Sequence, residues 1–214
     1  MPHPNDDFIA GLVDDLKPAR PLQQRRGMGW AVAALLAGAL TMLWLRGPRP
    51  DLAGGHPDAM FLISAGLFLV LTLASSWAAV DMARPAVGSR REGWVWTALM
   101  AAVLPVSAIV VISGNLSQGE DSGVHWGGLE CMLYGLGWSL LTAATLVVWL
   151  RRGAPSNPAR AGLLAGVAAG SAGIFAVALQ CPVNALAHIG VWHGMTVVLA
   201  GIAGRIALPR LLRW

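Results

Sequence analysis

The chain has 214 residues, of which 56% are hydrophobic and only 12% are charged. Because a soluble domain carries about 25% charged residues, this composition argues against a soluble globular protein. The net charge is +4 and the isoelectric point is near 10. The basic residues flank long apolar blocks, so membrane topology explains the high isoelectric point and binding to nucleic acid is not required.

Residues 1–26 are predicted to form a segment outside the membrane, with a short amphipathic helix in "NDDFIAGLVDDLKPARPL". Its apolar residues recur with the period of an α-helix, whereas Asp14 and Asp15 belong to the acidic positions. Such a short helix is not stable alone in water, so its apolar face needs a partner. The candidate partners are the headgroup layer of the membrane and a protein with an apolar groove and a basic rim. The apolar residues are Phe8, Ile9, Leu12, Val13 and Leu16.

Six apolar blocks of about 20 residues follow, each long enough to cross a bilayer. We therefore predict an all-α polytopic membrane protein whose residues 27–214 form a bundle of six transmembrane helices. The first block follows an acidic segment rather than the short basic region of a signal peptide, so it is expected to be retained. The blocks are Gly27–Leu45, Ala59–Val80, Gly93–Ile112, Gly128–Leu150, Ala161–Leu179 and Leu186–Leu208.

The distribution of charge predicts the orientation of these helices. Of the 15 lysines and arginines, only Arg46 and Arg49 fall on one side of the predicted membrane. The positive-inside rule then places both termini in the cytoplasm.

The fifth block contains a ridge of small residues with Gly162, Gly166 and Gly170 at intervals of four. Such ridges let helices approach closely in lipid. The sequence predicts close packing of this ridge, either inside the bundle or in a homodimer.

The chain has two cysteines, Cys131 in "GGLECMLYGLGW" and Cys181 in "LQCPVNALAHIGVWHG". The first lies near the outer start of the fourth predicted helix and the second just past the outer end of the fifth. Both therefore lie on the non-cytoplasmic face at similar depth, where they can meet. Pro182 ends the helix there and is expected to expose the Cys181 thiol to water.

Three interpretations of the cysteine pair remain open: a structural disulfide in an oxidising compartment, two unlinked thiols that act as small apolar side chains, and a redox- or metal-responsive site. The third is supported by candidate ligands on the same face, since thiolates with imidazoles suit soft metal ions. His193 is expected to lie deeper, near the middle of the membrane. The candidate accessory ligands are His125, Glu130, His188 and His193.

The sequence contains none of the usual enzyme signatures, such as G-x-S-x-G, H-E-x-x-H, a P-loop or a dinucleotide fingerprint. Its acidic residues avoid the centres of the predicted helices, where a proton pump would need them. We therefore expect a protein that is not an enzyme.

Five stretches carry a resemblance to a known family: "LVDDLKPARPL", "GLECMLYGLGWSL", "WLRRGAP", "LQCPVNALAHIGVWHG" and "LPRLLRW". Over essentially its whole length the chain resembles the six-helix membrane anti-sigma factors of the NrsF type, which restrain extracytoplasmic-function sigma factors in proteobacteria. The resemblance implies that the cytoplasmic N-terminal segment holds the sigma factor. It also implies that Cys131 and Cys181 match cysteines linked to the sensing of metal or oxidative stress.

The sequence thus predicts an anti-sigma factor of the bacterial inner membrane that releases its sigma factor when a periplasmic signal changes the cysteine pair. No resident cofactor is expected, although a thiophilic metal ion could bind transiently at the two thiols. The alternative is a redox or metal-handling membrane enzyme or transporter that uses the same thiols. Retention of a cytosolic protein partner and metal flux into vesicles would distinguish the two hypotheses.

Overall fold

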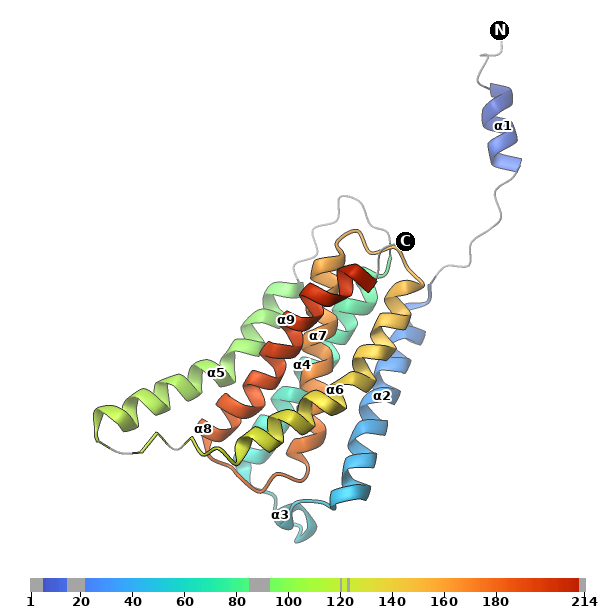
Figure 1. Cartoon of the computed structure of the whole chain (residues 1–214). Helices are drawn as coiled ribbons and strands as arrows, with labels where there is room; N and C mark the ends of the chain where they lie inside the picture. The colour runs from blue at the N-terminus through green and yellow to red at the C-terminus, as the bar shows by residue number, and fades with distance from the viewer. Residues whose placement is uncertain (1–5, 15–21, 85–92, 120, 123, 212–214) are drawn as a thin grey trace.

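The computed structural model describes residues 6–14, 22–84, 93–119, 121–122 and 124–211, and all regular structure in these ranges is helical (Figure 1). Six of its helices, counting the run from α8 to α9 as one, are long and apolar enough to cross a membrane. The elements are α1 (Asp6–Asp14), α2 (Gln24–Arg46), α3 (Pro50–Ala53), α4 (Ala59–Met82), α5 (Gly93–Ser117), α6 (Gly128–Arg151), α7 (Pro158–Ala178), α8 (Leu186–His188), the π-helical turn η1 (Ile189–His193) and α9 (Gly194–Leu211).

The six apolar blocks predicted from the sequence are confirmed as six long helices, with most bounds within three residues of those expected. The exception is α5, which continues to Ser117, beyond the predicted end of its block at Ile112. Ser113 and Ser117 are part of this extension, and each hydroxyl is satisfied by donating to a carbonyl three residues earlier. The chain leaves the helix at Gly119, whose φ of 77° suits glycine.

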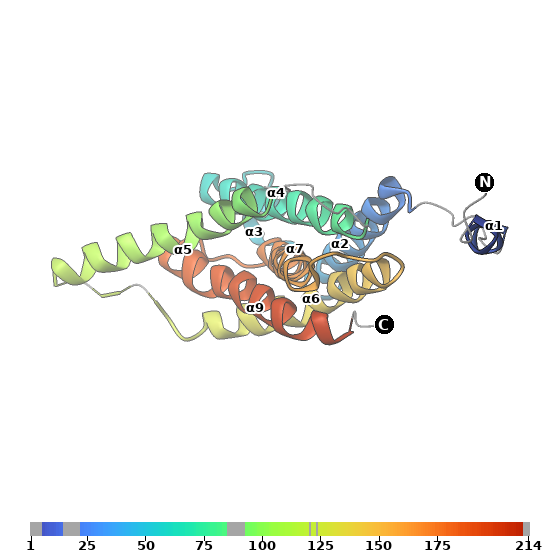
Figure 2. The same cartoon turned by 90° about the horizontal axis from the view of Figure 1, so that it is seen from above.

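Helix α7 lies in the middle of the bundle, with α2, α4, α6 and α9 around it (Figure 2). In its most apolar stretch 89% of the residues are buried, compared with 17% in α5. A helix can be enclosed on all sides in this way when its side chains are small, and α7 consists largely of alanine and glycine. The position of α7 therefore sets the positions of its neighbours.

The glycine ridge of α7 is used inside the chain. A Cβ on Gly162 would come within 2.4 Å of the Gly204 carbonyl oxygen of α9, and one on Gly166 within 2.2 Å of the Ala200 carbonyl oxygen. Gly170 likewise meets Ala200 and its neighbours on α9. The prediction of close packing is confirmed, but a homodimer through this ridge is not compatible with the structure, because α9 already covers it.

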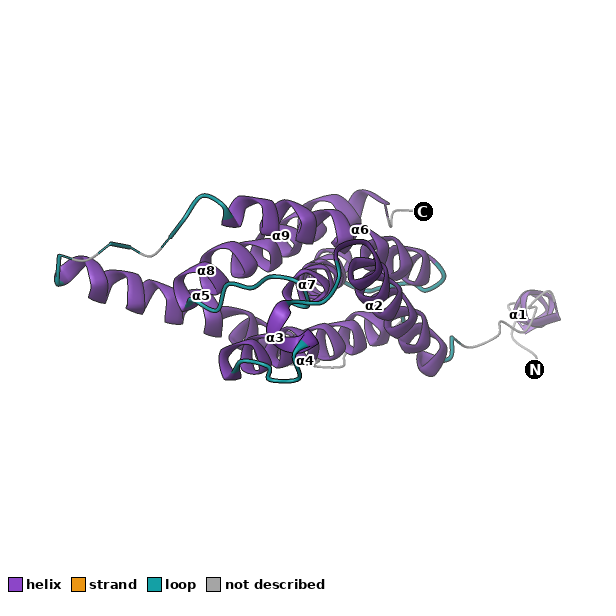
Figure 3. Ribbon diagram, turned by 90° about the horizontal axis from the view of Figure 1, so that it is seen from below, coloured by secondary structure: helices purple, strands orange, loops and turns teal. Residues whose placement is uncertain are grey.

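One end of the bundle, which we call the α3 end, carries the short helix α3 (Figure 3). The other end, where α2 begins and α9 ends, we call the C-terminal end. At the α3 end the buried Arg49 side chain donates hydrogen bonds to Asp51 and to Asn184, 2.7 Å from its amide oxygen. The hydrogen bond from Arg49 lowers the pKa of the Asp51 carboxyl from 3.8 to about 2. This arginine therefore ties the connection after α2 to the connection after α7.

Helix α1 stands away from the bundle (Figure 1), and its Leu12 and Val13 side chains are 55% and 57% exposed. It ends at Asp14, so Asp15 and Leu16 of the predicted amphipathic face lie outside the described residues. The exposed apolar face of α1 has the chemistry of a surface that binds a partner.

Replacing Gly166 with alanine is expected to destabilise the bundle by about 1–3 kcal/mol, because the added methyl group must push two backbones apart. The matched control is Gly66→Ala on α4, where a Cβ would meet nothing within 4 Å. The control should be neutral or slightly stabilising, since alanine favours helix more than glycine does. Thermal unfolding of both variants in detergent checks this, and equal midpoints would show that the α7–α9 contact is not tight.

Candidate functional site: a thiol and imidazole cluster

The two cysteines come together at the α3 end of the bundle. Cys131 lies in the first turn of α6, and Cys181 lies in the connection that follows α7. Their sulfur atoms are 3.8 Å apart and both thiols are free, so the expected proximity is confirmed. The expectation that Cys181 is open to water is wrong: the residue is only 3% exposed. The chain after Pro182 folds back over it as α8 begins, and the thiol is covered.

Two histidines complete the cluster, and a π-helical turn aligns them. His188 ends α8 and His193 ends η1. In an α-helix, residues five apart point about 140° away from each other. The wider π turn closes over five residues instead, and the two rings lie edge to face with centroids 5.1 Å apart. His193 therefore belongs to this cluster, as its place among the candidate ligands predicted, and lies level with the other three side chains rather than deeper in the bundle.

The backbone of η1 is held in place by α5. A Cβ on Gly190 would come within 2.2 Å of the Ala108 methyl group and 2.6 Å of the Leu104 carbonyl oxygen. A Cβ on Gly194 would come within 2.9 Å of the Pro105 ring. The two glycines at this spacing let the π turn press against α5, so the sequence "IGVWHG" serves packing as well as the cluster.

The cluster has the size of a metal site. The ligand atoms of Cys131, Cys181, His188 and His193 all lie within 4.8 Å of one another. A tetrahedral zinc site with bond lengths of about 2.3 Å to sulfur and about 2.0 Å to nitrogen has S–S edges of about 3.8 Å and S–N edges of about 3.5 Å. The structure shows 3.8 Å between the sulfurs and 3.5 Å from the Cys181 sulfur to the His188 Nε2 atom. Two of the edges thus already match.

The His193 ring is buried without a hydrogen-bond partner. His193 is 2% exposed, and neither of its ring nitrogens makes a hydrogen bond. A buried polar atom without a partner costs about 1–3 kcal/mol. Such an orphaned group beside two thiols is what a site for a soft or borderline metal ion would require.

The electrostatics of the cluster favour a thiolate at Cys181. The Cys131 thiol donates to it and lowers its pKa, and the contact with His188 acts in the same direction against the effect of burial. The thiolate is the form that binds metals and reacts with oxidants. Of the two sulfurs, Cys181 is therefore the one whose thiolate the surroundings favour.

Two of the predicted accessory ligands do not join the cluster. His125 and Glu130 are exposed, and neither belongs to the group of metal-ligating side chains found among the described residues. Glu130 directly precedes Cys131 on α6, but successive side chains of a helix point about 100° apart. Proximity to Cys131 in the sequence therefore did not predict that Glu130 would join the cluster.

Arg49 is a residue of the site that the sequence did not single out. Its backbone N–H donates to the Leu179 carbonyl oxygen at 3.0 Å and its side chain to Asn184, so it holds both flanks of the Cys181 segment. It also stacks over the Phe61 ring, 4.3 Å from the centroid. The only available signal was its rarity, as one of two arginines on this side of the predicted membrane.

The fold and the cluster define a class of protein: an all-helical bundle with six helices of membrane-spanning length and a candidate ligand site at one end. Comparison with known proteins adds the family. Residues 12–214 match the model of the NrsF family, described as negative regulator of sigma F, and the chain belongs to this family. Its role is therefore regulatory, the negative regulation of a sigma factor.

Two curated relatives cover nearly the whole chain. The anti-sigma-F factor NrsF of Caulobacter vibrioides is 31% identical over 98% of this chain and 99% of its own length. The probable anti-sigma-F factor NrsF of Azospira oryzae is 27% identical over 96% of this chain and 94% of its own length. No solved structure matches the chain.

Replacing His193 with phenylalanine is expected to separate stability from metal binding. The variant removes the unpaired buried nitrogens, so the metal-free protein should be as stable as the original or more stable, by up to about 1–3 kcal/mol. Its affinity for Zn²⁺ or Cd²⁺ should fall, because one ligand is lost. Metal titration and thermal unfolding of the purified protein check both effects.

The matched control is His125→Phe, which changes an exposed histidine outside the cluster and should alter neither quantity. A His193→Phe protein that binds both metals as tightly as the original would show that His193 is not a ligand.

Proposed function

We propose that this protein is an inner-membrane anti-sigma factor that holds an extracytoplasmic-function sigma factor at the cytoplasmic face. It releases the sigma factor when a thiophilic metal ion or an oxidant reaches its periplasmic cluster. The observation that carries the proposal is the gathering of four ligand atoms within 4.8 Å at one end of a bundle of six apolar helices. The two relatives, both named anti-sigma-F factors, support the choice of partner.

Charge supports the placement in the membrane. The cluster lies at the α3 end, which carries Arg46 and Arg49. The other basic residues that the structure describes lie toward the C-terminal end, on or beside the helices that reach it: Arg25, Arg26, Arg84, Arg151, Arg152, Arg160, Arg205 and Arg210. The positive-inside rule then makes the C-terminal end cytoplasmic. In a bacterium the α3 end faces the periplasm, an oxidising compartment, and both termini are in the cytoplasm.

Both proposed signals act on the same four side chains. A metal ion of zinc or copper type binds the two thiolates and the two imidazoles, and it releases the thiol protons. A two-electron oxidant instead removes two electrons and two protons from the thiols and joins the sulfurs, which must approach from 3.8 Å to a bond length of about 2.05 Å. The disulfide shortens the distance between the sulfurs, whereas the metal ion keeps the two matching edges and draws together the ligand atoms that now lie up to 4.8 Å apart.

The sigma factor is proposed to bind α1. Leu12 and Val13 form an exposed apolar pair on a nine-residue helix, and Asp14 at its end suits a basic rim on the partner. A short helix of this kind gains stability when its apolar face enters a groove. Phe8, Ile9 and Leu16 extend the same face in the sequence pattern.

Leu12→Asp or Val13→Asp is expected to free the sigma factor while the bundle stays in the membrane. Each removes the burial of one aliphatic side chain, worth about 1.5–3 kcal/mol, and so weakens binding at least about tenfold. Pull-down of the sigma factor with detergent-solubilised protein measures the loss.

The matched control is Ala10→Asp, which adds the same charge two residues from Leu12, on the side of α1 that Asp14 occupies. It should retain the partner. If all three variants retain the sigma factor equally, the contact lies elsewhere.

Cys131→Ser, Cys181→Ser and the double variant are expected to share one phenotype, in which the sigma factor stays bound when Cd²⁺ or an oxidant is added. The reason is that the two sulfurs act as one site. Partner release measured on stimulus, with protein levels controlled, checks this.

The other interpretations of the cysteine pair predict different results. If the cysteines form a structural disulfide, each single variant should be less stable but should still release its partner on stimulus. If the two thiols only fill space, all three variants should keep nearly the original stability and response. A normal response in the double variant would contradict the sensing role. Metal transport would instead show itself as flux into vesicles that depends on the same thiols.

A further inference from the structure

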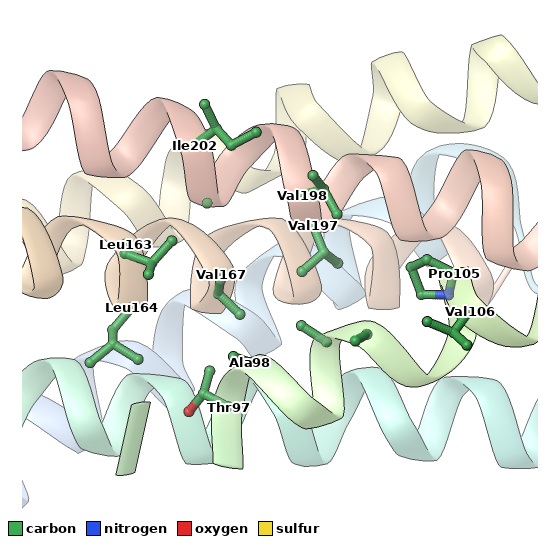
Figure 4. Close-up of a pocket in the computed structure, with 13 residues that line it drawn as sticks. Thr97, Ala98, Pro105, Val106, Leu163, Leu164, Val167, Val197, Val198 and Ile202 are labelled. Atoms are coloured by element: carbon green, nitrogen blue, oxygen red, sulfur yellow. The ribbon is translucent and has the colours of Figure 1, made fainter. Parts of the chain in front are cut away.

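A groove of about 350 Å³ lies between α5, α7 and α9, and its lining shares no residue with the thiol cluster (Figure 4). Its floor is formed by Leu164 and Val167 of α7. One wall is lined by small side chains of α5, among them Ala98 and Ala102, and the other by aliphatic side chains of α9 such as Ile202. Thr97 is the only residue of the lining with a polar side chain, so the groove is almost wholly apolar.

The groove is wedge-shaped. At one end α5 touches the start of α9, where a Cβ on Gly194 would lie 2.9 Å from the Pro105 ring. From Pro105 back to Thr97 the α5 wall runs eight residues, a rise of about 12 Å. This length is a little less than half of the hydrocarbon core, which is about 30 Å thick. The groove thus has the depth of one leaflet.

Helices α7 and α9, which form the floor and one wall of the groove, each carry an arginine at the open end of the groove. On α7, Arg160, Leu164 and Val167 lie at i, i+4 and i+7, one face of the helix. On α9, Ile202 and Arg205 lie at i and i+3, and Arg205 is exposed. On each helix, the face that lines the groove therefore carries an arginine side chain one turn beyond the last apolar residue.

The two arginines lie at the same level. Helices α7 and α9 are antiparallel, and Gly162 faces the Gly204 carbonyl group. Two residues before Gly162 and one residue after Gly204 come Arg160 and Arg205. On the membrane placement proposed above, this level is the headgroup layer of the cytoplasmic leaflet.

We propose that the groove binds an anionic phospholipid of the cytoplasmic leaflet, with one acyl chain between α5 and α9 and the phosphate against Arg205 and Arg160. Water is disfavoured because the lining is apolar. A transmembrane helix of a partner is about 10–12 Å wide with its side chains and cannot enter the closed end at Pro105. A flexible hydrocarbon chain fits a narrowing groove, and guanidinium groups pair well with phosphate.

The test uses the full-length protein in phosphatidylcholine vesicles that contain a minor share of phosphatidylglycerol with a photoreactive group in its acyl chain. Labelling of peptides from both α5 and α9, identified by mass spectrometry, is the expected result. Unlabelled phosphatidylglycerol should compete for the site. Arg205→Gln should lower the labelling about fivefold, the contribution of one arginine at a membrane surface.

Ala98→Phe combined with Ala102→Phe should abolish labelling of α9, because both side chains are exposed at the wall of the groove and would fill it. The controls are Ala144→Phe, exposed on α6, and Arg210→Gln, exposed near the end of α9, and neither should change the labelling. Competition on the unmodified protein keeps the test valid if the double variant does not fold.

Labelling spread evenly over all exposed helices, or unchanged in both Arg205→Gln and the filled variant, would overturn the proposal. Cross-links between two protein copies at the groove would do the same and would assign it to a second chain. Flotation of the protein with the vesicles reports insertion by itself, so a failure of the proposed membrane placement is seen separately. Partner release by Cd²⁺ tests the sensing function independently of this site.

Discussion

The close approach of α7 to its neighbours is the constraint on which the rest of this structure depends. Where Gly166 faces Ala200 of α9 and Gly173 faces Gly135 of α6, there is no space even for a methyl group. In lipid, helices gain little from the hydrophobic effect when they associate, so close van der Waals contact between small residues has to supply the attraction. A helix that meets backbone on two sides has little freedom to move, and α7 is therefore the fixed reference for the bundle.

The thiol cluster follows from where α7 ends. Because α7 is central, the connection that leaves it at Ala178 starts in the middle of the α3 end, and Cys181 is enclosed rather than exposed. Arg49 holds both sides of this connection. The π turn then brings His193 into line with His188. Three separate features of local structure thus place side chains that are far from adjacent in sequence around one small volume, and the same glycines that close the π turn fix it against α5.

The sequence was sufficient to predict the six long helices, because apolar blocks of about 20 residues between charged connections have the length that a helix needs to cross a bilayer. It also predicted that the two thiols meet, from topology alone. It named His193 among the candidate ligands but placed it deeper, near the middle of the membrane, because a π turn has no reliable sequence signature and an α-helix would have pointed this ring away from His188. The burial of Cys181 was missed for a related reason: a proline shows where a helix ends, but not how the following chain folds back. His125 and Glu130 were chosen by proximity along the chain, which says little about the direction of a side chain.

A signal from the cluster has to cross the bundle, and a ligand can shift an equilibrium only between arrangements that it binds with different affinity. Helix α7 cannot provide a second arrangement at low cost, because its glycines meet backbone on α6 and α9. Helix α5 can, since it is the least buried of the six long helices. Its Leu104 and Ala108 meet Gly190 of η1, and its Pro105 meets Gly194 at the start of α9. In the proposed sensing mechanism, a metal ion bound by the cluster would draw in His193, and with it the turn that rests against α5. The proposed lipid groove begins where Pro105 of α5 meets Gly194. If both proposals hold, the ligand of the cluster and the lipid of the groove would act on the same contact between α5 and the start of α9, and the composition of the cytoplasmic leaflet would bias the response to a periplasmic signal.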